Sequence, residues 1–220
     1  SSDRKAVDQS LFDGSTQRQP TVDGILNIIG ALTFQTQGNR YGDAGSTGNS
    51  EFLINSNEGG IMGTGNIIKL GDGNLRFYTP LHEWTGDLDI QDGFVGLQMN
   101  SGAIFNPNGK IYFGDSTGVQ TSAIQMRIEN RYYGNNTVGI DAPNMDLTVN
   151  RDIIVRDNIK QVVSISAGYL PTGGMIHFTN EINLGSGSSS YVRFYYEDNN
   201  NLDATLTGHA QQTIFDVTGN

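Results

Sequence analysis

Apolar and polar residues alternate along many short segments of this chain. The clearest segment is 124–129, where Ile124, Met126 and Ile128 are separated by polar residues. A period of two places one side of a strand toward a core and the other toward solvent. The same alternation recurs at Leu88 and Ile90, Leu147 and Val149, Ile153 and Val155, Val163, Ile165 and Ala167, Ile176 and Phe178, Ile182 and Leu184, and Leu202, Ala204 and Leu206.

Turn signals separate these alternating segments. They are Asp72-Gly73, Asp92-Gly93, Asn108-Gly109, Gly173-Gly174 and Asp198-Asn199-Asn200. Such pairs supply the positive φ values that tight hairpin turns require. Many short strands with frequent turns predict an all-β fold and exclude a helical or α/β domain.

The strands resemble one another without following a constant period. Segment 72–77 resembles segment 108–113, since both have a turn followed by alternating apolar residues, and segments 65–70 and 86–90 are looser versions. A solenoid with a constant repeat is therefore not predicted. Degenerate units punctuated by Gly are predicted instead, with convergent hairpin turns as the alternative explanation.

The first 50 residues differ from the rest. Asp3 could cap a short helical turn that ends at Gly14, or the stretch could be an irregular lead-in. After Pro20 strands and turns begin, and residues 38–50 are predicted to form a loop. We expect residues 1–50 to be a lead-in segment and loop, and residues 51–220 a repetitive β region with a sub-boundary near 140–150.

Composition supports a folded chain with many turns. Among 220 residues, 29 are Gly and 16% are charged, so Asn, Ser, Thr and Gln supply much of the polarity. A disordered acidic tail would need more charge and fewer aromatic residues. With a net charge of −10, the chain has no basic stripe for nucleic acid or an anionic membrane.

The chain has no Cys, which excludes disulfides and thiolate metal sites, and it has no apolar run long enough for a transmembrane helix. Its start lacks both a Met and the apolar core of a signal peptide. Since the end also lacks a terminal cap, we expect the sequence to be a fragment.

The apolar positions come in twos and threes for each strand, and few are large. A monomer built from such strands would have a thin core and many open sheet edges, which invite pairing with other chains. Winding identical chains together would remove both problems. We therefore expect an elongated, intertwined homo-oligomer, with a compact monomeric sandwich as the alternative.

Several short segments carry a resemblance to a known family: 86–93, 100–104, 145–150 and 153–158. They are similar to the short units of bacteriophage tail-fibre proteins, closest in style to the long tail fibres of T-even-type phages. The likeness covers residues 50–220 and is one of composition. It implies a slender homotrimer, located in the virion, that joins neighbouring tail-fibre proteins to the host surface.

Receptor tips of some such fibres carry closely spaced His pairs that bind metal. Here His82, His177 and His209 are isolated in the sequence, which argues against a metal-threaded tip. The resemblance implies a shaft or shaft-to-tip segment, with a host surface glycan or an outer-membrane protein as the receptor. We expect no cofactor, metal, nucleic acid or membrane insertion.

Tyr78, His82 and Trp84 gather aromatic and polar groups around Pro80. A sugar ring could stack on such an aromatic platform, so this segment is a candidate glycan-binding site. The alternative is that Trp84, the only Trp, anchors a loop against the core.

Glu83, Asp87 and Asp89 could supply the two carboxyl groups that glycoside hydrolysis requires. Acidic residues beside Gly are more often turn formers, and we expect no enzymatic activity and no catalytic residue.

The segment 191–198 carries aromatic residues on both faces of a predicted strand. Because interfaces favour Tyr and Arg, Tyr191, Phe194, Tyr195 and Tyr196 are candidates for packing between chains.

Asp72, Asp92, Asp115 and Asp157 lie in turns and could bind calcium, but none has the spacing of a calcium loop. No phosphate-binding loop, Gly-x-Ser-x-Gly elbow or zinc helix is present.

These features predict a non-enzymatic, structural and adhesive segment of a phage tail fibre. The alternatives are a tailspike-type polysaccharide depolymerase and a bacterial adhesin or carbohydrate-binding module.

Overall fold

A computed structural model describes residues 26–36, 51–55, 60–78, 81, 83–99, 102–115, 124–130, 146–157, 159, 163–168, 175–184, 192–197 and 214–217. These residues contain 19 strands and no helix, which confirms the all-β prediction. The expected lead-in helix and the loop 38–50 lie outside them.

Every strand pair within the described residues is parallel, and each pair joins two strands that are three places apart along the chain. The strands are β1 (Leu26–Ile28), β2 (Leu32–Gln35), β3 (Glu51–Asn55), β4 (Ile61–Gly63), β5 (Ile67–Leu70), β6 (Asn74–Tyr78), β7 (Glu83–Trp84), β8 (Leu88–Ile90), β9 (Phe94–Met99), β10 (Gly102–Ala103), β11 (Lys110–Phe113), β12 (Ile124–Asn130), β13 (Asp146–Val149), β14 (Asp152–Val155), β15 (Val163–Gly168), β16 (Met175–Phe178), β17 (Ile182–Asn183), β18 (Val192–Glu197) and β19 (Ile214–Val217).

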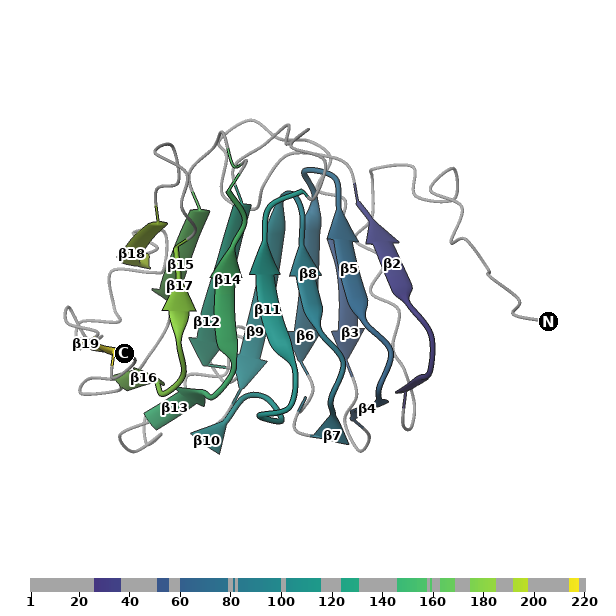
Figure 1. Cartoon of the computed structure of the whole chain (residues 1–220), viewed down its shortest axis with the longest axis horizontal. Coiled ribbons are helices and arrows are strands. Elements are labelled where there is room, and N and C mark those ends of the chain that lie inside the picture. The colour runs from purple at the N-terminus through teal and green to yellow at the C-terminus, as the bar shows by residue number, and fades with distance from the viewer. Residues whose placement is uncertain are drawn as a thin grey trace, which may run out of the picture.

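Three successive strands make one coil, and stacked coils make a parallel β-solenoid (Figure 1). The β2–β17 sheet has the order β17-β14-β11-β8-β5-β2, and the β3–β18 sheet has the order β18-β15-β12-β9-β6-β3. A third side consists of the β1–β7 sheet (β1-β4-β7) and the β10–β19 sheet (β10-β13-β16-β19), which the Leu81–Phe105 bridge connects.

Parallel pairing corrects the expectation of hairpins. The predicted turns Asp72-Gly73 and Asp92-Gly93 lie between strands of different sheets, where the chain changes direction around the solenoid. Gly71 and Gly93 have φ of +74° there, a conformation that favours glycine. The sequence therefore predicted the positions of these two turns correctly. The turns do not close hairpins, however, but form corners of the solenoid.

The coils vary in length, which agrees with the absence of a constant repeat in the sequence. In the β2–β17 sheet, neighbouring partners are separated by 21 residues from Ile67 to Leu88 and by 42 from Ile111 to Ile153. The residues between coil strands differ in number, while the strands keep their register.

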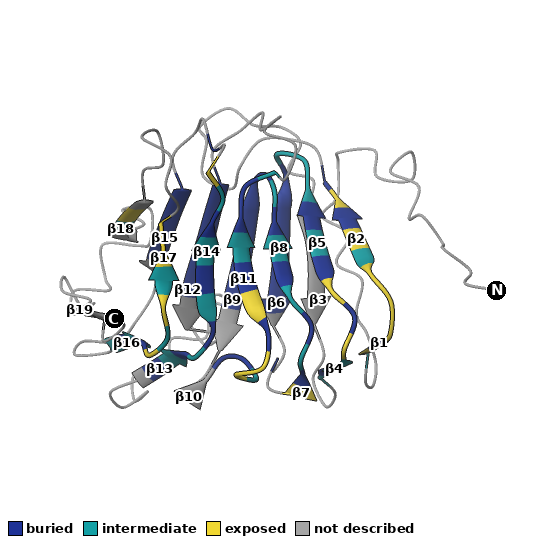
Figure 2. Ribbon diagram, in the orientation of Figure 1, coloured by how far each residue is buried: buried dark blue, intermediate teal, exposed yellow. Residues whose placement is uncertain are grey.

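The alternation seen in the sequence forms the core. One inward row of the β2–β17 sheet comprises Leu32, Ile67, Leu88, Ile111, Ile153 and Ile182. Together with Leu75, Val95, Met126 and Ile165 of the β3–β18 sheet, most of these side chains are completely buried (Figure 2). The described residues of a single chain thus enclose a buried core, and the intertwined homo-oligomer stays a prediction.

The expected domain boundaries do not separate the strands. β1 and β2 lie before residue 50 but pair with β4 and β5. β11 pairs with β14, and β12 with β15, across residues 140–150. The described strands on both sides of each boundary therefore share sheets.

Candidate functional site

The outward face of the β2–β17 sheet carries side chains that solvent can reach. The outward row comprises Thr33, Ile68, Asp89, Tyr112, Ile154 and Asn183, all half-buried or exposed. Because adjacent parallel strands lie about 4.8 Å apart, the row forms a flat line of polar, aromatic and aliphatic groups.

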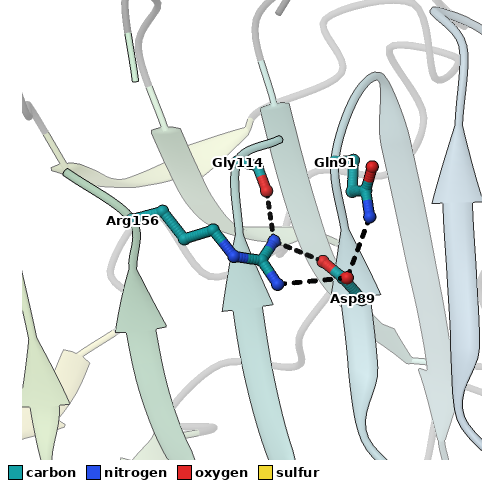
Figure 3. A network of polar contacts seen from close by, with 4 residues as sticks. All are labelled: Asp89, Gln91, Gly114 and Arg156. Carbon is teal, nitrogen blue, oxygen red and sulfur yellow. Dashed lines mark hydrogen bonds and ion pairs between the residues drawn. The ribbon is translucent and has the colours of Figure 1, made fainter. Parts of the chain in front are cut away.

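Arg156 and Asp89 form the main polar contact on this face (Figure 3). The Arg156 guanidinium donates to Asp89 Oδ1 at 2.6 Å and to Asp89 Oδ2 at 3.1 Å. It also donates to the Gly114 carbonyl, and Gln91 donates to Asp89 Oδ2 at 2.9 Å. Arg156 follows β14 and Asp89 lies in β8, so the contact spans the strand β11 between them.

Tyr112 of β11 completes this group of residues. The Arg156 guanidinium carbon lies 5.0 Å from the centre of the Tyr112 ring, within the range of a cation–π contact. One charged group thereby covers part of an aromatic ring and neutralises a carboxylate. We call Asp89, Gln91, Tyr112 and Arg156 the outer cluster.

Lys110 and Asp152 form a second polar contact on this face, beside the outer cluster. Lys110 Nζ lies 3.7 Å from Asp152 Oδ2, and both side chains are more than a third exposed. The Lys110 backbone N–H donates to Asp87 Oδ1 at 2.9 Å. The face therefore presents charges of both signs, an arrangement suited to a polar partner.

The three candidate carboxylates are not gathered in one place. Glu83 is exposed on β7 of the third side, while Asp89 lies on the β2–β17 sheet. Asp87 accepts a backbone N–H and Asp89 binds Arg156. Each of these two has a structural role between coils.

The glycan platform expected at Trp84 is wrong for that residue. Its side chain is completely buried, and its Nε1 donates to the Gly65 carbonyl at 2.7 Å. The alternative, a Trp that anchors the chain against the core, is what the structure shows. His82 lies outside the described residues, and so does the side chain of Tyr78, whose backbone belongs to β6.

Trp84 is buried because it packs against a buried arginine. The Arg151 guanidinium lies 4.7 Å from the Trp84 ring and 4.8 Å from the Phe105 ring. It donates to the carbonyls of Asn106 at 2.6 Å, Gly86 at 2.8 Å and Trp84 at 2.5 Å. Burial lowers the pKa of Arg151 to about 10, and nearby Asp87 opposes the shift. Arg151 thus connects three successive coils.

A second buried cation lies at another corner. Lys69 occupies an inward position between Phe34 and Ile90, and its side chain is completely buried. Its Nζ donates to the carbonyls of Leu70 at 2.9 Å, Gly71 at 2.5 Å and Asp92 at 3.2 Å. Burial lowers the pKa of Lys69 to about 7, against the opposing charges of Asp92 and Asp72.

The outward face of the β3–β18 sheet is polar but buried. Its buried residues include Asn74, Arg76, Gln125, Arg127, Ser164 and Ser166. Arg76 packs 5.4 Å from the Phe94 ring, and Gln125 donates to Ser166 at 3.0 Å. This face therefore contributes less to the accessible surface than the outer cluster does.

The cluster predicted to pack between chains is described only in part. Phe194 is partly buried, and its ring meets Phe178 of the same chain edge to face at 5.7 Å. Phe194 therefore packs within its own chain, and its packing between chains stays a prediction. Tyr191 and the side chains of Tyr195 and Tyr196 lie outside the described residues.

Among the turn acids, Asp92 is buried and accepts its neighbour's backbone N–H, from Gly93, at 3.0 Å. Where side chains are described, no group of three His, Asp or Glu residues is positioned to hold a metal. The described part of the chain has no helix long and apolar enough to cross a membrane.

Sequence reasoning missed Lys69, Arg151 and Arg156. The sequence contains one sign of Lys69, because this lysine interrupts the alternating apolar positions of segment 67–70. The sequence contains no such sign of the two arginines, since their hydrogen-bond partners are 42 to 67 residues away.

The comparisons with known proteins assign these residues no role. No protein-family model matches it, and neither a curated protein nor a solved structure matches it significantly.

Proposed function

We propose that this chain is a non-enzymatic, structural and adhesive segment of a phage tail fibre that takes part in attachment to the bacterial host. The observation that carries the proposal is the accessible face of the β2–β17 sheet, displayed on a closed solenoid. Parallel coils held by buried cations make a stiff support, and the outer cluster offers polar and aromatic groups to a partner.

The partner is a surface glycan or an outer-membrane protein. Tyr and Arg are enriched where proteins bind one another, and Tyr112 and Arg156 lie together on this face. A neutral or zwitterionic partner suits a chain with a net charge of −10. The assembly is a homotrimer in the virion, in contact with neighbouring fibre proteins.

Two measurements test this function. Light scattering after size exclusion should give the mass of a trimer, and a stable monomer would contradict the fibre assembly. Labelled chain should bind intact cells within a panel of bacterial strains. The Tyr112→Ser variant should bind less, whereas Glu83→Gln, on another side of the solenoid, should bind as the parent does.

Adhesion without catalysis has its own test. Incubation with capsular and cell-wall polysaccharides should release no reducing ends. If the chain releases reducing ends and the Asp89→Asn variant does not, the protein is a polysaccharide depolymerase and the adhesive, non-enzymatic function is refuted.

A further inference from the structure

The accessible face of the β2–β17 sheet carries three lines of side chains that cross the coils. The middle line is the outward row described above, and its large apolar members are Ile68, Tyr112 and Ile154. A first polar line lies where the strands begin, and its half-buried or exposed residues are Asn66, Asp87, Lys110, Asp152 and Glu181. A second polar line lies where the strands end, with Gln91 and Arg156. Apolar groups therefore follow the length of the solenoid between two polar borders.

The charges of this face largely neutralise one another. Arg156 pairs with Asp89, and Lys110 Nζ lies 3.7 Å from Asp152 Oδ2. Asp87 and Glu181 add only negative charge, in a chain whose net charge is already −10. The face therefore offers no excess of positive charge to an acidic glycan. Its carboxylates, amide and ammonium groups suit a neutral partner rich in hydroxyl groups, which both donate and accept hydrogen bonds.

The spacing of the strands suits a linear sugar chain. Adjacent strands are about 4.8 Å apart, so the six strands of the sheet span about 24 Å. An extended chain of pyranose rings advances by close to one strand spacing with each sugar, and its rings have apolar C–H faces and hydroxyl edges. Laid along the solenoid, such a chain places C–H groups on the middle line and hydroxyl groups on both polar lines. The sheet has room for about six sugars, one on each strand.

We propose that this face binds one neutral, linear polysaccharide chain along the axis of the solenoid, across Ile68, Tyr112 and Ile154. The proposal rests on the adhesive function proposed above, whose site it shares, and it selects the glycan over the outer-membrane protein. A polysaccharide repeats at close to the strand spacing, whereas the surface of a globular protein has no such repeat. The Arg156 guanidinium, 5.0 Å from the centre of the Tyr112 ring, supports the aromatic side chain on which a sugar packs.

Sugar chains of graded length test the proposal. Neutral O-polysaccharides from the panel of bacterial strains, partly hydrolysed and separated by length, are the probes for calorimetry. Affinity should rise by at least about tenfold from a single sugar to a chain of about six, because each added sugar makes contacts while the entropic cost of association arises once. Longer chains should bind no more tightly. An affinity that stops rising after the first or second sugar would overturn the extended chain, and fragments that all fail to bind would refute the glycan.

Substitutions along the middle line locate the sugar chain. Ile68 lies two strands from Tyr112 on one side, and Ile154 lies on the next strand on the other. Ile68→Ser and Ile154→Ser should each weaken binding of the six-sugar chain about three- to tenfold, because methylene groups are lost from the contact. Met62→Ser, at a half-buried residue of the third side, is the matched control and should bind as the parent does. A loss in Ile154→Ser alone would indicate a single-sugar site beside Tyr112 and contradict the proposal.

Cell binding separates this proposal from the function on which it rests. If labelled chain binds cells but no fragment, the adhesive function stands, and the glycan is refuted in favour of an outer-membrane protein. If fragments bind but cells do not, the glycan site stands and the attachment role is refuted. If a serine variant fails to fold, the length dependence measured with the parent decides.

Discussion

Two arginines at opposite ends of β14 perform related tasks in different surroundings. Arg151, before the strand, is buried between two aromatic rings and donates to three backbone carbonyls. Arg156, after the strand, has a side chain that is 23% exposed, and it pairs with Asp89 over one ring. Both reach across coils, but only Arg151 is enclosed by the core.

The two arginines therefore differ in what they contribute: one to the stability of the fold, the other to its accessible surface. A buried polar group whose partners are removed costs the full desolvation energy, whereas an exposed ion pair contributes little. Arg151 should therefore determine stability. Arg156 should mainly set the shape and charge of the accessible face.

The largest effect is expected at Arg151. Arg151→Ala would leave three carbonyls without their donor and a cavity between Trp84 and Phe105. The free energy of unfolding should fall by about 3–5 kcal/mol, the range for breaking a buried polar network or truncating a large core side chain. Urea denaturation measures it, and a loss below about 1 kcal/mol would refute a supporting role.

A glycine beside Arg151 tests how closely the corner is packed. A Cβ at Gly109 would lie 2.5 Å from the Gly86 carbonyl oxygen and 2.5 Å from the Arg151 guanidinium carbon. Gly109→Ala should cost about 1–3 kcal/mol, as overpacking does. Gly30 at the first corner has no atom within 4 Å of such a Cβ. Gly30→Ala is the matched control and should be nearly neutral; equal losses would contradict this packing.

Lys69 extends the comparison to a buried cation that can lose its charge. Its pKa of about 7 in the folded chain lies below the usual 10.5. Between these values the unfolded chain binds the extra proton, so stability rises with pH. The gain from pH 7 to pH 8 should be about 1 kcal/mol.

Chemical denaturation at the two pH values, compared with Lys69→Met, isolates this contribution. The variant should lack the gain, whereas Lys110→Met, at an exposed lysine, should retain it. A parallel pH response in parent and Lys69→Met would show that Lys69 stays charged.

The smallest effect on stability is expected at the surface. Arg156→Ala should change the free energy of unfolding by about 0–1 kcal/mol, because its ion pair with Asp89 is partly hydrated. Cell binding should nevertheless weaken, since Tyr112 loses its guanidinium partner. A large loss of stability would place Arg156 in the supporting framework with Arg151.

Alternation in segments such as 124–129 predicted strands and their inward side chains, because a two-residue period follows directly from strand geometry. Parallel pairing was not predictable. Asp92-Gly93 has the same local chemistry in a hairpin and at a solenoid corner, and only contacts distant in sequence distinguish them. Trp84 illustrates the same limit at the candidate site, since its burial depends on Arg151, 67 residues later.

The central claim is that one chain forms parallel coils by pairing with itself, and engineered cysteines test it most directly. Lys110 and Asp152 are register partners on neighbouring strands, both accessible, in a chain without Cys. Partners about 4.8 Å apart lie within the Cα separations that disulfides span. The double variant Lys110→Cys, Asp152→Cys should oxidise to a disulfide within one chain. Disulfides formed only between chains would contradict the claim and would show that neighbouring coils come from different chains.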